Sequence, residues 1–182
     1  MMLRDVCPAD LPEILALNQT WVAVLSPLDA ARLAQLHTQA ALHRVIEQDG
    51  RVVAFMLAFR EGADYDGANF QWFAQRYERF LYIDRIVVAG SAQAHGIGTL
   101  LYRDAMAVAA RERVPYLTCE IDIEPPNTVS QRFHGRLGFR ELGQRHLDGG
   151  KTVAMQVLEI PAGPNSGAAT GGDAGYATSA TS

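Results

Sequence analysis

The chain has 182 residues, 48% of them hydrophobic and 20% charged, which fits one globular domain with a sizeable core. Its net charge of -4, with no stripe of lysine and arginine, gives a nucleic-acid partner no electrostatic support. No apolar run approaches the roughly 20 residues that cross a bilayer, and the N-terminus meets acidic and proline residues too early for a signal peptide. Cys7 and Cys119 are too few for a disulfide scaffold and lack metal-ligand spacing. We expect a soluble, cytoplasmic protein without a metal.

Two helices are predicted near the start of the chain, after a short strand at 3–6. Asp10 is placed to cap a helix that runs to about Asn18, because an apolar stripe follows it at helical spacing. Ser26-Pro27-Leu28-Asp29 combines a cap, a proline at the first helical position and an early carboxylate. This combination predicts a second helix from the cap to about Ala41.

A β-hairpin is predicted next, with strands at 43–48 and 51–59. Asp49-Gly50 joins them, and this dipeptide suits a type I′ turn because both residues tolerate a positive φ.

The rest of the predicted domain alternates strands and helices, with Gly138 as a typical C-terminal stop for the last helix. These elements are a strand at 81–88, a helix to about 113, a strand at 116–122, a helix at 128–137, and strands at 139–145 and 152–160. The order predicts a mixed α/β domain with one central sheet.

A long aromatic link, EGADYDGANFQWFAQRYERF, occupies 61–80 between two predicted strands. Links of this length are functional loops unless they contain a helix of their own. Two interpretations stay open: a small helix that covers the sheet, or a lid that lines a substrate pocket.

The last residues, 161–182, differ in kind from the rest, being almost all Gly, Ala, Ser, Thr, Pro and Asn. Such a segment buries too little apolar surface to offset its ordering entropy. We expect a flexible tail after a folded domain at 1–160.

A glycine-rich turn, Gln93-Ala94-His95-Gly96-Ile97-Gly98-Thr99, joins the strand at 81–88 to the following helix. It lacks the third glycine of a dinucleotide-binding turn and the Gly-Lys-Ser/Thr ending of a P-loop. What remains is a turn whose backbone N–H groups point outward at a helix start, which favours a pyrophosphate. A tight turn with two glycines and no ligand is the alternative.

At this point the sequence resembles the GCN5-related N-acetyltransferase (GNAT) superfamily. Gln93 to Gly98 match its Gln/Arg-x-x-Gly-x-Gly/Ala motif, and Asn127-x-x-Ser130-x-x-Phe133-His134-x-x-Leu137-Gly138-Phe139 resembles its second signature. The resemblance covers residues 1 to about 160. It implies a central mixed, mostly antiparallel sheet with a splayed strand pair, flanked by helices on both faces.

The resemblance also implies acetyl-coenzyme A as acyl donor, without a metal. The implied coenzyme-binding residues lie on the strand before the turn, in the turn, and in the second signature. They are Ile86, Val87, Val88, Gln93, His95, Gly96, Ile97, Gly98, Thr99, Asn127 and Ser130. For His95 the alternative is a side chain that points to solvent.

Acyl transfer to an amine needs a stabilised oxyanion and a proton for the departing thiolate. The resemblance assigns the first to donors such as the backbone N–H of Val88. For the second, the family often has a tyrosine after the phenylalanine of the second motif, where this chain has His134. An imidazole with a reference pKa of ~6.5 suits that proton transfer, so we hypothesise that His134 is the general acid. The alternative is a partly buried histidine bonded to a carbonyl.

The candidate general bases are carboxylates on the two predicted strands that flank the splay. Asp84 is expected to share a strand face with Tyr82 and Ile86, and it is the first candidate. Pairing with Arg85 is its alternative role. Glu120 and Asp122 lie together on one face of the next strand.

The function predicted from these features is transfer of an acetyl or other short acyl group from acyl-coenzyme A to a primary amine. The amine belongs to a small molecule or a protein, and the aromatic link favours one with an apolar or aromatic part. A non-catalytic acyl-coenzyme A sensor on the same fold is the alternative. A homodimer is left open, since exposed final strands in this fold often pair.

Overall fold

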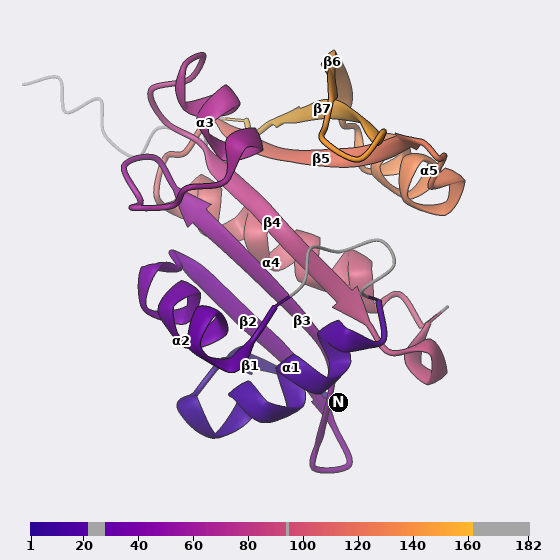
Figure 1. The fold of residues 1–182 in the computed structure, drawn as a ribbon. Coiled ribbons are helices and arrows are strands. Elements are labelled where there is room, and N and C mark those ends of the chain that lie inside the picture. Colours follow the sequence, from indigo (N-terminus) through magenta and orange to yellow (C-terminus); the bar gives the residue numbers. More distant parts are fainter. Residues whose placement is uncertain (22–27, 94, 162–182) are drawn as a thin grey trace, which may run out of the picture.

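The computed structural model describes residues 1–21, 28–93 and 95–161 (Figure 1). Its elements in chain order are β1 Met2–Asp5, the 3-10 turn η1 Pro8–Asp10, α1 Leu11–Gln19, α2 Ala30–Gln39, β2 Leu42–Gln48, β3 Arg51–Arg60, α3 Ala68–Ala74, β4 Leu81–Val88, the 3-10 turn η2 Gly90–Ala92, α4 Ile97–Arg111, β5 Tyr116–Glu124, α5 Thr128–Leu137, β6 Arg140–His146 and β7 Thr152–Glu159. The predicted tail lies outside these residues, apart from its first one.

One seven-stranded sheet carries the fold, in the order β1-β2-β3-β4-β5-β7-β6. All neighbours are antiparallel except β4 and β5, which are parallel and pair only at Leu81↔Leu117 and Tyr82↔Thr118. Beyond that point the two strands diverge, as Figure 1 shows for the magenta and orange arrows. The predicted mixed, mostly antiparallel sheet with a splayed strand pair is confirmed.

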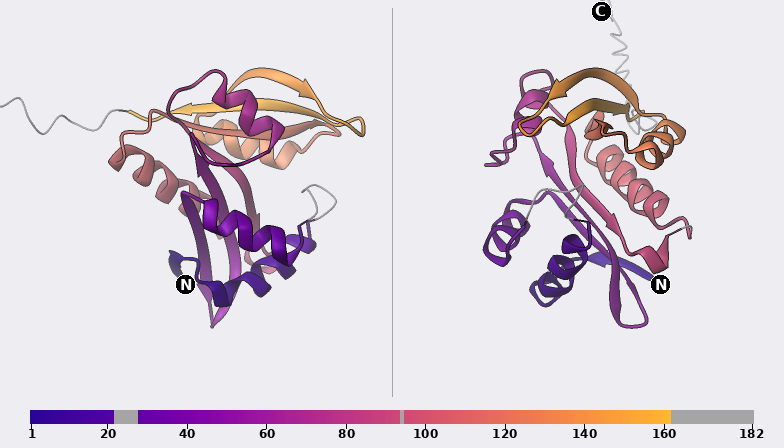
Figure 2. Two further views of the ribbon diagram at one scale, coloured as in Figure 1. Left: turned by 60° about the vertical axis from the view of Figure 1, so that its left-hand side comes forward. Right: turned by 45° about the vertical axis from the view of Figure 1, so that its right-hand side comes forward.

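Helices cover both faces of the sheet, with α1, α2 and α3 on one face and α4 on the other (Figure 2). On β5 the two faces alternate, as the strand period requires. Leu117, Cys119 and Ile121 pack in the core beneath α4, so Thr118, Glu120 and Asp122 point to the opposite face. The face of β5 that carries carboxylates is therefore the face of α1 to α3.

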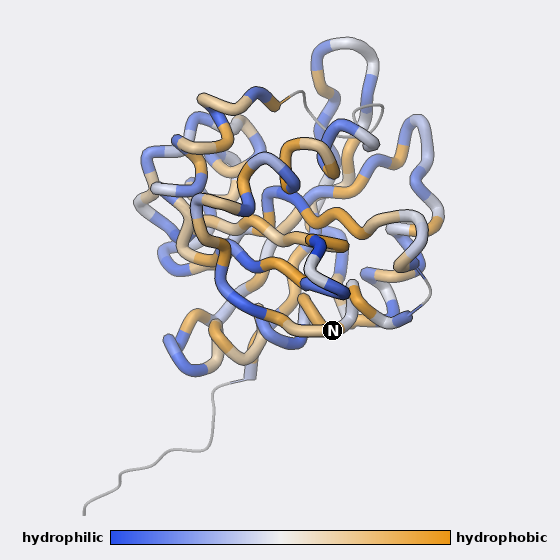
Figure 3. The backbone as a smooth tube through the Cα atoms, turned by 90° about the horizontal axis from the view of Figure 1, so that it is seen from below, coloured by the Kyte–Doolittle hydropathy of each residue, from blue (hydrophilic) through white to orange (hydrophobic). Residues whose placement is uncertain are grey.

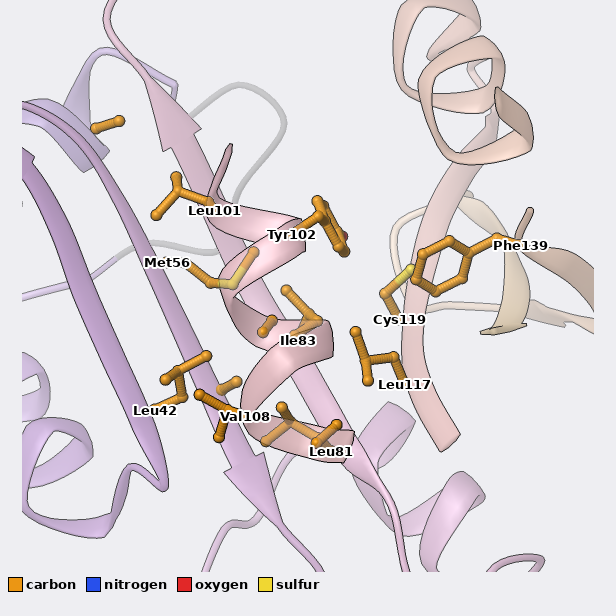
Figure 4. Close-up of a cluster of buried hydrophobic side chains, with 14 of the residues drawn as sticks. Leu42, Met56, Leu81, Ile83, Leu101, Tyr102, Val108, Leu117, Cys119 and Phe139 are labelled. Carbon is orange, nitrogen blue, oxygen red and sulfur yellow. The ribbon is translucent and has the colours of Figure 1, made fainter. Parts of the chain in front are cut away.

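Helix α4 packs across both halves of the splayed sheet (Figure 4). Its buried Tyr102 lies between Met56 of β3 on one side and Cys119 of β5 with Phe139 on the other. This shared core fixes the angle between β4 and β5 without a continuous ladder of hydrogen bonds between them.

Hydrophobic residues occur in short runs broken by hydrophilic ones along the tube (Figure 3). Within the described residues, no helix is long and apolar enough to cross a membrane.

The hairpin turn has the predicted conformation, since Asp49 and Gly50 have φ of 53° and 74°. The predicted start of the second helix needs correction. Helix α2 begins at Ala30, where Asp29 caps it by accepting a hydrogen bond from the Arg32 N–H at 2.7 Å. Ser26 and Pro27, the predicted cap and first helical position, lie outside the described residues.

Asp10 is the N-cap residue of α1, as predicted, although its side chain makes no capping hydrogen bond to that helix. Its carboxylate accepts the Cys7 N–H at 2.8 Å, one turn earlier, and pairs with Arg4 at 2.7 Å. The Arg4 guanidinium holds the pKa of Asp10 well below its usual range.

The aromatic link contains the small helix α3, which was one of its two predicted interpretations. Phe70 and Phe73 of this helix are buried against the sheet. Tyr65, ahead of the helix, stacks on Phe59 of β3 with ring centroids 4.3 Å apart.

Candidate active site

The glycine-rich turn leads from β4 into α4, and its two glycines are required for different structural reasons. Gly96 is the N-cap of α4 with φ of 72°, a left-handed conformation that L side chains rarely adopt. Gly98 lies in the first turn, where an added Cβ would come within 3.2 Å of the Phe133 ring of α5. Gly98 thus lets α5 pack against α4, whereas the space beside Gly96 is open.

The start of α4 presents backbone amides that the helix itself does not use. Its first internal bond runs from the Leu100 N–H to the Gly96 carbonyl at 3.0 Å, so the N–H groups of 97–99 precede the helical pattern. Gln93 and His95 are exposed beside them, with the His95 ring 3.3 Å from the Ala92 carbonyl. Ala94 lies outside the described residues. This arrangement suits an anion such as a pyrophosphate.

Strand β4 contains a bulge at Asp84, between the pairs Ala58↔Ile83 and Leu57↔Arg85. The extra residue reverses the alternation, so that Ile86 packs with the α4 core while Val87 packs with the α1 to α3 core. The expectation that Asp84 shares a face with Ile86 is therefore wrong. The bulge brings both Asp84 and Arg85 to the side of α1 and α3.

Asp84 has two partners on that side. Its Oδ1 accepts a hydrogen bond from the Tyr65 hydroxyl, and its Oδ2 lies 2.7 Å from Arg85 Nε. Arg85 also donates from Nη1 to Asn18 Oδ1 of α1 at 3.0 Å. Arg85 thus links the Asp84 carboxylate to the end of α1.

Glu120 of β5 lies across the splay from Asp84 and has different surroundings. Its two carboxylate oxygens accept hydrogen bonds from the buried Tyr82 hydroxyl at 3.0 and 2.8 Å. Burial, with a smaller contribution from the charge of Asp84, raises the pKa of Glu120 to about 7, although hydrogen bonds from Asn69 and Tyr82 oppose the rise. A carboxyl group with such a pKa exchanges protons near neutrality.

His134 of α5 is buried, and both of its ring nitrogens have partners. Nδ1 lies 2.8 Å from the Ser130 carbonyl, and Nε2 lies 2.7 Å from the Tyr102 hydroxyl. A carbonyl only accepts, so Nδ1 carries the proton and Nε2 accepts from Tyr102 in the neutral ring. Burial lowers the pKa of His134, against a smaller opposing effect of the Ser130 carbonyl.

The first turn of α5 holds the two polar residues of the second motif. Asn127 caps the helix, with its Oδ1 accepting the Ser130 N–H at 3.1 Å. The Ser130 hydroxyl lies 3.2 Å from His134 Nδ1. Asp122, the remaining carboxylate of the predicted set, forms an ion pair with Lys151 at 2.8 Å.

The profile of the Acetyltransferase (GNAT) family matches residues 11–139. The chain belongs to the GNAT family. A search among curated proteins found no match.

Solved GNAT-fold structures superpose on most of the chain. Ribosomal-protein-S18-alanine N-acetyltransferase from Escherichia coli gives a TM-score of 0.69 at 20% identity, over 90% of this chain and 97% of that one. Ard1 from Thermoplasma volcanium gives 0.71 at 14% identity, over 88% and 97%. The NatC complex bound to Gag peptide and CoA gives 0.69 at 14% identity, over 88% and 98%. At these identities the likeness shows the GNAT fold.

The GNAT fold brings the predicted site residues to two places. The turn 93–99 and the motif at Asn127 and Ser130 lie at the starts of α4 and α5, which pack against each other through Gly98 and Phe133. Asp84 lies on the opposite face of the sheet, with Glu120. Within the described residues no cluster of three or more His, Cys, Asp or Glu side chains is arranged to hold a metal.

Sequence reasoning missed three side chains that contact the carboxylates or their neighbours. Tyr65 and Asn69 lie in the aromatic link, and Arg145 lies on β6. The aromatic content of the link pointed to the segment, but no local signal distinguishes Asn69 or Arg145 from ordinary surface residues.

Proposed function

We propose that this GNAT protein transfers an acetyl or other short acyl group from acyl-coenzyme A to a primary amine of a small molecule or a protein. The observation that carries the proposal is the combination of two features at the splay: helix-start amides at 97–99 that precede the internal bonds of α4, and a carboxyl group, Glu120, with a pKa of about 7. The first suits a pyrophosphate and the second suits removal of a proton from an ammonium.

In this proposal the coenzyme binds on the α4 and α5 side of the splay. The pyrophosphate contacts the turn 93–99, including His95, while the pantetheine arm pairs with the backbone of 86–88, where β4 has left β5. Asn127 and Ser130 lie near the thioester. The Val88 N–H stabilises the oxyanion of the tetrahedral intermediate.

The amine approaches from the face of α1 to α3, because both carboxylates point there. Of the predicted bases we favour Glu120 over Asp84. Both carboxylate oxygens of Asp84 are already engaged, one by the Tyr65 hydroxyl and the other by Arg85. Asp84 and Arg85 then form a fixed ion pair beside the base.

His134 is the proposed acid, with a condition that its contacts impose. To protonate the thiolate, Nε2 has to carry a proton and leave the Tyr102 hydroxyl, which occupies it at 2.7 Å. Replacing His134 with Phe is then expected to lower turnover far more than coenzyme binding. Unchanged turnover would assign His134 to helix packing alone.

The proposal is tested by thiol release from acetyl-CoA with a broad panel of small amines and N-terminal peptides. We expect release that depends on the amine and that falls about 10²- to 10⁴-fold in Glu120→Gln, the range typical for a lost general base. The matched control is Glu159→Gln, which removes an exposed carboxylate at the far end of β7. Coenzyme binding without amine-dependent release across the panel would favour an acyl-coenzyme A sensor.

A further inference from the structure

Strand pairing places Arg145 and Glu120 on one face of the sheet. Glu120 of β5 pairs with Met155 of β7, and Arg145 of β6 pairs with Val153, two residues further along β7. Met155 and Val153 both pack in the core beneath α1 to α3. Directly paired residues point to the same side of a sheet, so the guanidinium and the carboxylate share the face that α3 covers.

Helix α3 packs against β6 on this face of the sheet. Trp72 approaches Gly143 of β6, where an added Cβ would lie 3.8 Å from the indole ring. Gly143 pairs with the same Met155 as Glu120 does. This distance is an ordinary van der Waals contact, so Trp72 places α3 directly against β6.

Asn69, in the first turn of α3, contacts the guanidinium of Arg145. Its Oδ1 accepts a hydrogen bond from Arg145 Nη1 at 2.5 Å. A guanidinium has only donors, so this contact identifies the oxygen end of the amide and directs the NH₂ end elsewhere. A carboxylate only accepts, and Asn69 is among the groups that lower the pKa of Glu120 against the effect of burial.

We propose that Asn69 and Arg145 are positioning residues for Glu120: Arg145 fixes the orientation of the Asn69 amide, and the amide nitrogen donates to the Glu120 carboxylate. The inference rests on the proposed role of Glu120 as the base. It gives the aromatic link a function in the reaction, which is to bring one amide to the splay.

We call the indirect contact from Arg145 through the Asn69 amide to Glu120 the relay. It has a chemical consequence that a direct ion pair between Arg145 and Glu120 would not have. A guanidinium in contact with Glu120 would strongly stabilise the charged form and leave a weak base. An amide between them orients the carboxylate with a neutral donor, so that the carboxyl group keeps a proton affinity suited to neutral pH.

The experiment follows the titration of Glu120 directly, by NMR of protein labelled with ¹³C at the glutamate carboxyl carbon. The signal is assigned by its loss in Glu120→Gln. The variants are Asn69→Ala, Arg145→Gln and the double variant. Arg140→Gln is the matched control, because Arg140 lies on the same strand but pairs with Glu159 at 2.9 Å.

We expect Asn69→Ala to raise the Glu120 titration midpoint by about one pH unit, the size of one lost hydrogen bond to a charged group. Arg145→Gln is expected to raise it by a similar amount, Arg145→Lys by less, and Arg140→Gln not at all. The double variant is expected to match Asn69→Ala alone, because Arg145 acts through Asn69. Arg145→Lys keeps the test valid if Arg145→Gln does not fold.

Different results overturn different statements. A Glu120 midpoint near 7 that Asn69→Ala leaves unchanged would overturn the relay and leave the proposed base standing. Additive shifts in the double variant would also overturn it, since Arg145 would then act on Glu120 independently. A midpoint near the ordinary ~4.3 in the unaltered protein would instead refute the proposed base.

Discussion

Replacing Glu120 with Gln is expected to stabilise the folded protein at alkaline pH while it removes the proposed base. Glutamine keeps the length of the side chain and an oxygen that accepts from the Tyr82 hydroxyl, which donates to Glu120 at 2.8 Å. It does not carry the charge that burial and the neighbouring Asp84 disfavour. Stability and activity should therefore change in opposite directions at one residue.

The size of the effect follows from the pKa of Glu120. In the folded chain this pKa is about 7, against an ordinary value of 4.5. The folded state thus binds more protons than the unfolded state between these values, and stability is lost as the pH rises through them. The full difference corresponds to about 3 kcal/mol, at roughly 1.4 kcal/mol per pH unit, and is reached above pH 7.

The assay is urea unfolding of the unaltered protein and of Glu120→Gln at pH 5 and pH 8. We expect the variant's advantage in free energy of unfolding to grow by about 2 kcal/mol between the two values. Glu159→Gln, which changes an exposed carboxylate, is the matched control. A pH-independent difference for Glu120→Gln would refute the reasoning about its proton affinity.

Three further predictions concern stability elsewhere in the fold. Burial and the nearby His37 lower the pKa of His43 to about 4 from 6.5, so the protein should lose up to about 3 kcal/mol of stability as the pH falls from 6.5 to 4. Acid unfolding of His43→Leu should show a smaller loss, and an unchanged dependence of stability on pH in this range would contradict the lowered pKa of His43. Gly96→Ala should cost about 1 kcal/mol in thermal unfolding, because alanine has to adopt a φ of 72°, and Gly96→Asn should cost less; equal stability of all three proteins would count against a left-handed N-cap. Asp29→Ala should cost about 1 kcal/mol by removing the cap on α2, and a cost near zero would show that the cap bond contributes nothing in solution.

Elements with strong local signals were predicted almost to the residue. The strand at 81–88 and the helix at 128–137 have the predicted bounds, because a run of β-branched residues and an Asn-to-Gly pair of helix ends are both local features. The start of α2 was predicted too early, because Asp29, which was interpreted as a carboxylate in the first turn, is the residue that caps the helix.

The parts that sequence could not supply depend on strand register and on tertiary contacts. The bulge at Asp84 exists only relative to β3, so the alternation rule placed Ile86 on the wrong face. The contact of His134 with Tyr102 joins residues 32 apart in sequence, and that of Arg145 with Asn69 joins residues 76 apart. No local pattern encodes such pairs.

Calorimetry with acetyl-CoA and with S-acetylpantetheine, which lacks the pyrophosphate, tests the central claim most directly. We predict that the folded protein binds acetyl-CoA and binds the truncated thioester at least tenfold more weakly, because the amides at 97–99 lose their anion. Equal affinity for the two compounds, or no binding of acetyl-CoA by folded protein, would contradict the account.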